Sequence, residues 1–308
     1  MTVTERAPAP TSDRSVLARR QAAAGRTFVA PNLFAVAVFM VFPLGFSLYM
    51  AFQKWDLFTP AKFVGWANFH QLLTGDPLFA IALRNTVVLT VGTTVPTVVI
   101  SLIVAAVLNR KLKGIGVFRT ILFLPLAVSS VVMAMVWRFV FDTSNGLFNI
   151  MLGWIGIGPV PWLVDPKWAM FSVCLVSIWK SVPFATAILL AAMQGIPDDL
   201  YEAAKMDGAG EVRRFFAITV PLIRSALSFV VVISIINSFQ AFDQVYVLTG
   251  AHGGPATSTY VFGIMLIQNA FDFTDIGYAS ALAWVMFAIL LVITFLQLRF
   301  SRRNSLEQ

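Results

Sequence analysis

Charged residues are scarce in this chain of 308 residues. They make up 12% of it, whereas 58% is hydrophobic and the mean hydropathy is +0.80. Soluble domains usually have about a quarter of their residues charged. The composition therefore excludes an ordinary water-soluble domain, and it predicts that lipid surrounds most of the chain.

Cysteine and histidine are almost absent as well. The single cysteine, Cys174, lies in an apolar run, so neither a disulfide within the chain nor a cysteine-based zinc cluster is possible. The two histidines, His70 and His252, lie far apart in polar connections. We therefore expect no metal site, and no set of residues in the sequence predicts a catalytic one.

Nucleotide-binding motifs are missing too. The sequence has no Gly-x-x-x-x-Gly-Lys-Ser/Thr segment, so it lacks the backbone cradle and the lysine that hold phosphates. It also has no His-Glu-x-x-His and no Gly-x-Ser-x-Gly segment. The chain is thus expected to bind no cofactor and to hydrolyse no ATP itself.

Long apolar runs dominate what is present. Six runs reach the length of about 20 residues that a bilayer requires. They predict an all-α polytopic membrane protein with six transmembrane helices in residues 28–302, preceded by a disordered basic tail (1–27) and followed by a short tail (303–308). The runs are roughly 32–53, 85–108, 117–141, 168–193, 222–248 and 277–299, with prolines at Pro43, Pro96, Pro125 and Pro183 that predict kinks.

The basic residues indicate the orientation. Most of them lie in the N-terminal tail, in residues 109–120 and 194–224, and at the C-terminus. Cytoplasmic connections carry the excess of Lys and Arg, so both termini and the loop 197–221 are expected in the cytoplasm. The net charge of +7 therefore reflects membrane orientation, and nucleic-acid binding is not expected because no stacking aromatics alternate with the basic residues.

Residues 142–167 form an unusual outer connection, in which glycines and prolines alternate with large apolar residues. This composition predicts a short helix lying along the membrane interface. Trp162 and Trp168 are expected at the level of the lipid headgroups.

The loop 197–221 is the longest polar interruption in the second half of the chain. Proline and the two aspartates that follow predict the start of a helix, with Glu202 in its first turn. The segment Asp207-Gly208-Ala209-Gly210 predicts a turn, and Glu211–Ile218 predicts a second short helix that Pro221 closes. The loop is therefore expected to form two short helices at an angle.

Polar side chains inside a membrane span are costly and usually face the bundle interior or a wet path. The fifth run holds Asn237, Gln240 and Gln244 at positions i, i+3 and i+7 of one predicted helix face, together with Asp243 and Tyr246. Amides and carboxylates suit sugar hydroxyls, which both donate and accept hydrogen bonds. We consider these residues a candidate substrate path; the alternative is that the amides hold helices together.

The fourth run contains a lysine, Lys180, next to Trp179. Three roles are open for Lys180: lining the pore, extending to the membrane surface, or pairing with Asp243. We add Lys180 and Trp179 to the candidate substrate path.

The loop motif and several other segments resemble a known family. The motif is similar to the coupling motif of ABC importer permeases, and the other segments are similar to the carbohydrate branch of that family, of the maltose and glycerol-phosphate type, where this chain resembles the first of two permease subunits. The motif residues are Glu202, Ala203, Ala204, Asp207, Gly208, Ala209, Phe215, Ile218 and Pro221; the segments are 84–86, 118–125, 146–149, 241–250, 253–255 and 277–281. The chain departs from the family at Ser225, where proline is frequent.

The resemblance implies a type I ABC importer permease fold in the bacterial cytoplasmic (inner) membrane. It also implies four kinds of partner: a second, homologous permease in a heterodimer, two ABC ATPase subunits that use ATP and Mg, an extracytoplasmic substrate-binding protein or lipoprotein, and the lipid bilayer. The loop 197–221 would couple the ATPase to alternating access for a sugar or sugar-like solute.

Two other classes of membrane protein are alternatives to an ABC importer permease. A secondary carbohydrate transporter or facilitator would not need the cytoplasmic helical pair, and it usually shows inverted repeats and ion-coupling carboxylates inside the membrane. In the predicted spans, Asp243 alone is a candidate for such a carboxylate. A membrane-embedded enzyme would need a nucleophile and a base that converge, and the sequence indicates none.

Overall fold

The computed structural model describes residues 13–110 and 114–303, and the elements in these ranges are helical apart from one hairpin. The hairpin pairs β1 (Gln53–Lys54) antiparallel with β2 (Lys62–Phe63). The helices are α1 (Asp13–Val36), α2 (Phe42–Ala51), α3 (Ala67–His70), α4 (Pro77–Leu108), α5 (Ile115–Phe123), α6 (Ser130–Val140), α7 (Leu147–Trp154), α8 (Pro166–Gln194), α9 (Asp198–Met206), α10 (Glu211–Arg214), α11 (Val220–Leu222), α12 (Arg224–Phe239), α13 (Asp243–Thr249), α14 (Phe262–Ile267) and α15 (Ile276–Arg303). The predicted all-α architecture is therefore confirmed.

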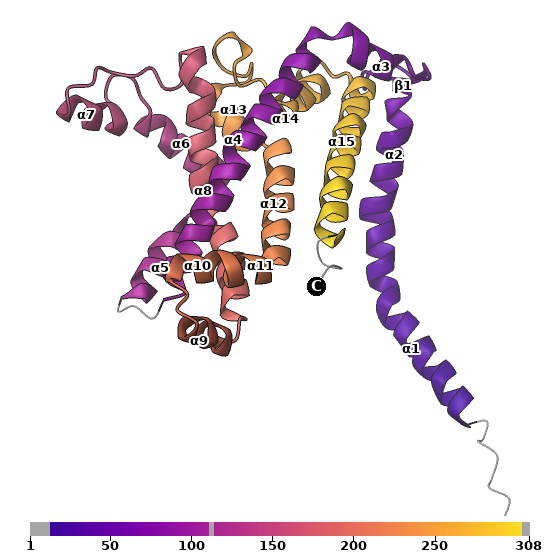
Figure 1. The fold of residues 1–308 in the computed structure, drawn as a ribbon. Coiled ribbons are helices and arrows are strands. Elements are labelled where there is room, and N and C mark those ends of the chain that lie inside the picture. Colours follow the sequence, from indigo (N-terminus) through magenta and orange to yellow (C-terminus); the bar gives the residue numbers. More distant parts are fainter. Residues whose placement is uncertain (1–12, 111–113, 304–308) are drawn as a thin grey trace, which may run out of the picture.

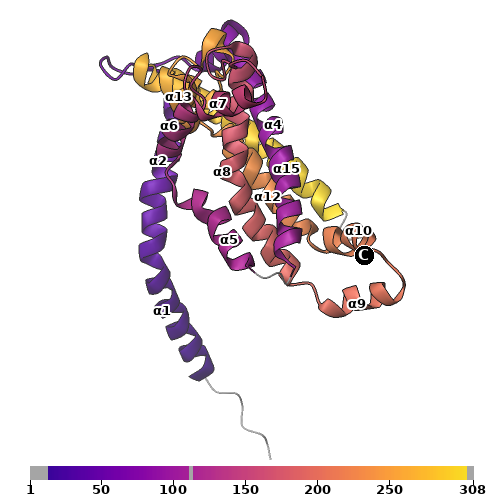
Figure 2. The ribbon, with the colours of Figure 1, turned by 90° about the vertical axis from the view of Figure 1, so that its left-hand side faces the viewer.

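Short 3-10 and π-helical turns join or interrupt these helices. The π-helical turns are η1 (Ala37–Val41), η2 (Gln71–Gly75), η4 (Phe215–Thr219) and η6 (Gln268–Asp272), and the 3-10 turns are η3 (Leu124–Ala127) and η5 (Pro255–Thr257). Because η1 continues α1 into α2, these three elements form one long helix at the edge of the molecule (Figures 1 and 2).

Four helices in the described residues are long and apolar enough to cross a membrane, at Ala24–Ala51, Pro77–Leu108, Pro166–Gln194 and Ile276–Arg299. Two bent pairs raise the number to as many as six if each pair is one span. One pair joins Ile115–Ala127 to Ser130–Val140 at 105°, and the other joins Glu211–Leu222 to Arg224–Phe239 at 71°. The sequence therefore predicted a multi-span helical protein correctly, and the count of spans stays between four and six.

The N-terminal region differs from the prediction. A disordered tail was expected up to residue 27, but α1 already begins at Asp13, about four turns earlier. Alanines and arginines between residues 18 and 26 are good helix formers, so the helix extends beyond the apolar run that defined the prediction. Residues 1–12 and 304–308, on which the rest of the two predicted tails falls, lie outside the described residues.

The third apolar run is broken rather than gently kinked. Pro125 lies in the 3-10 turn η3, and α6 starts only at Ser130, after the extended residues Val128 and Ser129. Proline cannot donate the backbone hydrogen bond that would continue α5. The two halves therefore meet at a sharp angle near the middle of the run.

The fifth run is also broken, which contradicts the prediction of one continuous polar helix face. Helix α12 ends at Phe239 and α13 restarts at Asp243, so Gln240, Ala241 and Phe242 form a non-helical link. This link lies against α14, where a Cβ at Gly263 would come within 2.6 Å of the Ala241 carbonyl oxygen. Tertiary packing, which the periodicity of the sequence does not show, therefore sets the break.

The core lies mainly between α4, α8, α12 and the elements around them. A Cβ at Gly92 would lie only 3.1 Å from the Cys174 Sγ, which shows how closely α4 and α8 pack. Ser101 on α4 adds a hydrogen bond to the Val182 carbonyl oxygen on α8, at 3.1 Å. Small residues permit such close helix packing in lipid. The long α1–α2 helix, by contrast, meets the rest of the protein mainly along α15.

Several of the segments that carried the family resemblance tie the hairpin end of the bundle together. The Asn85 amide donates to the Thr257 and Tyr260 carbonyl oxygens, and the Thr86 hydroxyl accepts from the Phe262 backbone amide. A Cβ at Gly277 would fall 1.9 Å from a backbone oxygen of the hairpin, so only glycine fits there. These residues fix α4, α14 and α15 relative to one another.

A buried polar chain adds to this cap. The Tyr260 hydroxyl donates to Gln268 Oε1 at 2.8 Å, and Gln268 donates in turn to the Ala251 carbonyl oxygen. Burial, with the nearby Asp76 carboxylate as a smaller cause, raises the pKa of Tyr260 to about 12. Tyr260 therefore remains a neutral donor throughout the physiological pH range.

Candidate functional site

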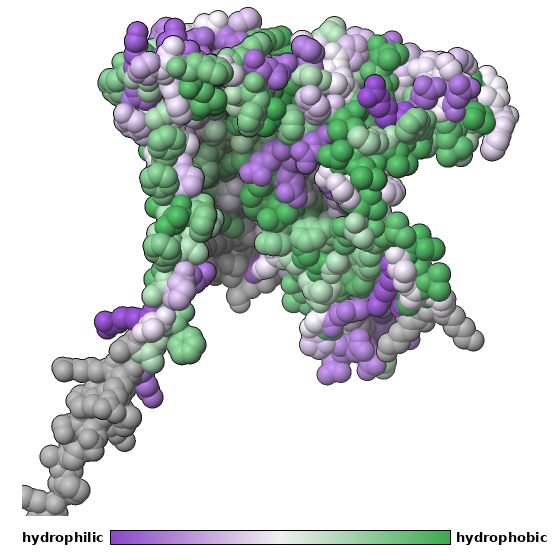
Figure 3. Space-filling view, turned by 180° about the vertical axis from the view of Figure 1, so that it is seen from behind, coloured by the Kyte–Doolittle hydropathy of each residue, from purple (hydrophilic) through white to green (hydrophobic). Residues whose placement is uncertain are grey.

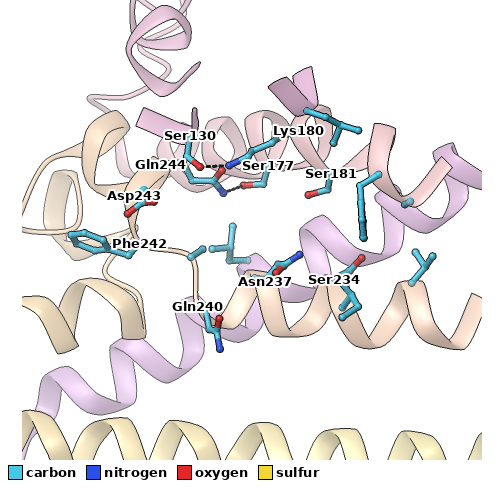
Figure 4. A pocket seen from close by; sticks show the side chains of 18 residues that line it. Ser130, Ser177, Lys180, Ser181, Ser234, Asn237, Gln240, Phe242, Asp243 and Gln244 are labelled. Atoms are coloured by element: carbon cyan, nitrogen blue, oxygen red, sulfur yellow. Dashed lines mark hydrogen bonds between the residues drawn. The ribbon is translucent and has the colours of Figure 1, made fainter. Parts of the chain in front are cut away.

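A polar cavity of about 390 Å³ lies between α8, α12 and the starts of α6 and α13 (Figure 4). Its size falls within the usual range of small-molecule sites. Its lining residues are Leu89, Leu126, Ser130, Ser177, Lys180, Ser181, Phe184, Ala185, Val230, Ile233, Ser234, Asn237, Ser238, Gln240, Ala241, Phe242, Asp243 and Gln244. Hydroxyls and amides dominate the polar part of this lining, with one ammonium and one carboxylate.

The two helix breaks meet at a single turn of α8. The Lys180 ammonium donates to the hydroxyl of Ser130, the first residue of α6. Gln244 Nε2, near the start of α13, donates to Ser177 Oγ at 2.7 Å. Ser177 and Lys180 lie three residues apart on α8, so both half-helices are tied to the same place (Figure 4).

Five of the seven predicted substrate-path residues line this cavity: Asn237, Gln240, Asp243, Gln244 and Lys180. They come together because the break at 240–242 turns the chain around the cavity, and not because they share a helix face. No ion pair joins the described residues Lys180 and Asp243, although both line the cavity. Lys180 therefore lies in the cavity wall, where it contacts Ser130.

The other two predicted residues lie elsewhere. Trp179 packs edge-to-face on Trp137, with ring centroids 5.7 Å apart, and Tyr246 packs on Phe242 at 5.2 Å. The sequence prediction missed Ser130 and Ser181, among other lining residues. The only sequence feature that could have indicated these two residues is that each is a serine inside an apolar run.

The loop 197–221 forms two helical arms joined by a tight turn. At the C-terminus of α9, Ala209 N donates to the Ala204 carbonyl oxygen at 2.9 Å, and Gly208 N donates to the Lys205 carbonyl oxygen at 3.0 Å. These two bonds are a Schellman motif, which needs a left-handed residue. Gly208 supplies it with a φ of +76°. The Asp-Gly-Ala segment is therefore a helix stop, as the sequence predicted.

Details of both arms differ from the prediction. Pro197 takes the N-cap position of α9, so Asp198 and Asp199 fill the first turn and Glu202 lies one turn later. The second arm runs from Glu211 through Pro221 to Leu222, and the break comes at Ile223. Proline near the start of the short α11 is compatible with a helix, because a first-turn residue needs no internal donor.

Three contacts hold the arms to each other and to the bundle. Phe215 packs against a buried cluster that includes Leu108 and Met193. The Tyr201 and Thr219 hydroxyls, one from each arm, hydrogen bond at 2.9 Å. An exposed ion pair at 2.8 Å joins Arg110, just beyond α4, to Glu211 on α10. Phe215 was predicted to serve coupling, and the structure places it as the anchor of the loop.

The outer surface of the arms is open. Among the motif residues, Glu202, Ala203, Asp207 and Gly208 are exposed, whereas Ala204, Ala209, Ile218 and Pro221 are half-buried. Large apolar side chains outside the motif are also exposed, namely Leu200, Met206, Val212 and Phe216. These four were not among the predicted site residues, and together with Glu202 they form what we call the loop surface.

Comparison with known proteins assigns the chain to a family of transport proteins. A family model described as binding-protein-dependent transport system inner membrane component matches residues 97–306. The chain belongs to this family. It is 35% identical to a trehalose/maltose transport system permease protein of Thermococcus litoralis, over 94% of this chain and 97% of the relative. It is 34% identical to a sn-glycerol-3-phosphate transport system permease protein of Yersinia pestis, over 90% of this chain and 93% of the relative.

The fold agrees with a solved structure as well. This permease superposes with a TM-score of 0.80 on a chain from a bacterial alginate ABC transporter in complex with an alginate pentasaccharide-bound periplasmic protein. The two chains are 24% identical, and the match covers 92% of this chain and 96% of the other. The sequence-based assignment to the carbohydrate branch of ABC importer permeases is therefore confirmed, and the chain is a transport subunit of the membrane.

Proposed function

We propose that this permease carries a sugar or sugar-like solute, such as an oligosaccharide, a polyol or a glycerophosphate ester, through the cavity at the helix breaks. The observation that supports this is a cavity at mid-span whose polar lining consists mainly of hydroxyls and amides. Such groups can donate to and accept from solute hydroxyls, while Phe184 and Phe242 offer apolar surface to the C–H face of a sugar ring.

Transport by alternating access would require a second permease. One chain supplies only one wall of a path, and the cavity here is partly open rather than enclosed. A homologous partner in a pseudo-twofold heterodimer would close it from the opposite side. A substrate-binding protein would then deliver the solute at the end of the bundle that carries the hairpin.

The loop surface is the proposed docking site for one of two ATPase subunits. Its apolar side chains are exposed in the described chain and would fill a groove on the ATPase. Glu202 would pair with a basic residue there. Breaking such a buried pair on one side costs roughly 3–5 kcal/mol. ATP and Mg would be bound by the ATPase partner.

The orientation follows from the same assignment. The beginning of α1, the loop arms and the end of α15 lie toward the same end of the bundle (Figure 1). With ATP on the cytoplasmic side, both termini would face the cytoplasm of a bacterium, across its inner membrane. The distribution of basic residues supports this orientation independently.

Reconstituted uptake tests the proposal. The permease is produced together with its genomic neighbours, and proteoliposomes are assayed for ATP-dependent uptake of the solute that the binding protein retains. We expect Gln240→Ala to lower uptake at least several-fold without loss of the ATPase from the complex. Uptake that persists without the ATPase would favour a secondary transporter, and unchanged uptake in Gln240→Ala would move this residue to a structural role.

A further inference from the structure

The connection between α6 and α8, residues 142–165, forms a lobe at the side of the bundle that we call the α7 lobe (Figure 1). Its first and last residues, Asp142 and Asp165, are its only charged residues. Both carboxylates are used locally: Asp142 accepts from the Ser144 and Asn145 backbone amides, and Asp165 accepts from Lys167 N. The residues between Asp142 and Asp165 thus carry no charged side chain that could be solvated by water or form an ion pair with a protein.

One side of the lobe is a fixed, buried scaffold. The Asn149 side chain donates to the Thr143 and Val160 carbonyl oxygens and accepts from Val160 N and from the Trp162 indole, at 2.9–3.0 Å. Phe148 and Leu152 pack beside it in the core. Trp162 was predicted at the headgroup level, but only 8% of it is exposed, because its indole is bound inside this scaffold.

The opposite side of α7 is apolar and uncovered. Leu147, Ile150, Met151 and Trp154 follow one helix face at positions i, i+3, i+4 and i+7. All four are large and exposed, with Trp154 exposed to 78%, and Ile155 beyond the helix is exposed to 71%. Water around this much apolar surface is costly, at roughly 25 cal/mol per Å². A soluble surface would interrupt such a face with charges.

The uncovered face continues the apolar surface of a spanning segment. Val132, Val136 and Phe139 are exposed along α6, which leads directly into the lobe. Hydrophobic surface reaches up toward the projecting part of the molecule, while hydrophilic residues gather at the upper rim (Figure 3). At the far end of the lobe, Lys167 Nζ lies 5.6 Å from the centre of the Trp168 ring, a pairing typical of the headgroup level.

From these features we infer that the exposed face of the α7 lobe rests in the lipid at the outer surface of the membrane, among headgroups and the upper acyl chains. The occupant is lipid rather than protein, because the face carries no charged residue between Asp142 and Asp165 and follows directly on the exposed apolar residues of α6. The lobe differs from an ordinary interfacial helix, since its second face does not face water: the Phe148 ring packs on Trp137 of α6 at 5.7 Å, and Ser172 of α8 donates to the Trp162 carbonyl oxygen at 2.9 Å. The lobe would thus be a rigid interfacial element that fixes how deeply α6 and α8 sit in the membrane.

Fluorescence quenching by brominated lipids tests this placement. In a Cys174→Ala background of the full chain, Trp154→Cys carries an environment-sensitive dye in vesicles of phosphatidylcholine brominated at shallow or deep acyl positions. We expect blue-shifted emission and at least twofold stronger quenching by the shallow bromines than by the deep ones. The matched control is Phe58→Cys, a site 83% exposed in a hairpin flanked by Lys54 and Lys62, which should emit as in water.

Two results would overturn the inference. Water-like emission without quenching at Trp154→Cys would place the face in solvent. Blue-shifted emission without quenching by either lipid would place it against a protein neighbour. A second site, Ile155→Cys, guards against a local effect of the dye. Neither measurement depends on ATP or on the solute, so a failure here is distinct from a failure of the proposed transport function.

Discussion

Gly208 is the residue on which the geometry of the loop surface depends. Its φ of +76° ends α9 and turns the chain toward α10. A side chain there costs about 1–2 kcal/mol. We expect Gly208→Ala to keep the protein in the membrane but to lower solute-stimulated ATPase activity several-fold in the assembled transporter. Gly210→Ala is the control, because Gly210 has an ordinary φ of −65° and open space around it.

Parent-level activity in both variants would show that the turn does not transmit force. The comparison is sharp because both sites lie in the same turn and both changes add one methyl group. A loss in both variants would instead indicate that any bulk in the turn blocks docking.

Lys180 is the second residue whose contact makes a prediction. Lys180→Met keeps the length of the side chain but removes the donor to Ser130 at the start of α6. Interhelical hydrogen bonds in membranes are worth about 1 kcal/mol. We therefore expect hydrogen exchange of the amides at 133–136, the first of α6 with helical acceptors, to rise roughly fivefold in Lys180→Met. Lys167→Met, at the lobe end of the same helix, should leave these amides unchanged; an equal rise in both would rule out the specific contact.

At the scale of elements, the break between α12 and α13 depends on Gly263. An alanine there would bring its Cβ within 2.6 Å of the Ala241 carbonyl oxygen and 3.0 Å of Phe242 Cβ. Overpacking of this kind typically costs 1–3 kcal/mol. We expect Gly263→Ala to lower the thermal stability in detergent and to weaken solute uptake, since the link forms part of the cavity wall. Gly153→Ala on α7, with open space around it, should change neither.

The same break shows where the sequence stops being informative. Hydrophobicity located the runs, and the glycine and proline pattern of the loop located its turn, because both are local properties. The link at 240–242 has no proline or glycine of its own; its cause is the close approach of Gly263, more than 20 residues away. Asn237, Gln240, Asp243 and Gln244 of the fifth run line the cavity, but their arrangement follows from this distant contact.

The burial of Trp162 could not be predicted from composition for a similar reason. Tryptophan beside prolines in an outer connection is typical of a headgroup position. The decisive partner, Asn149, lies 13 residues earlier and binds the indole at 3.0 Å. A single polar residue in an apolar segment was the one available signal.

At the scale of the whole molecule, the described helices are buried to very different degrees. Within the most apolar stretch of each span, 56% of the residues are buried for α8 and 33% for α4, but only 6% for the helix from Ala24 to Ala51. That helix meets the bundle along α15 and then diverges from it (Figure 1). An apolar helix with so little packing belongs against lipid or against a second chain, and a heterodimer would use it as a ready surface.

A labelling experiment separates these two environments. Phe39 lies in the exposed part of this helix, and Phe39→Cys in a Cys174→Ala background carries the same dye in vesicles with deep-brominated lipid. For the chain alone we expect strong quenching, because lipid covers the helix. In the assembly with the second permease, quenching should fall at least threefold, since the partner's helices replace the lipid there. If quenching is equal in both preparations, the long helix faces lipid throughout, and the second permease meets this chain only at the face where the cavity opens.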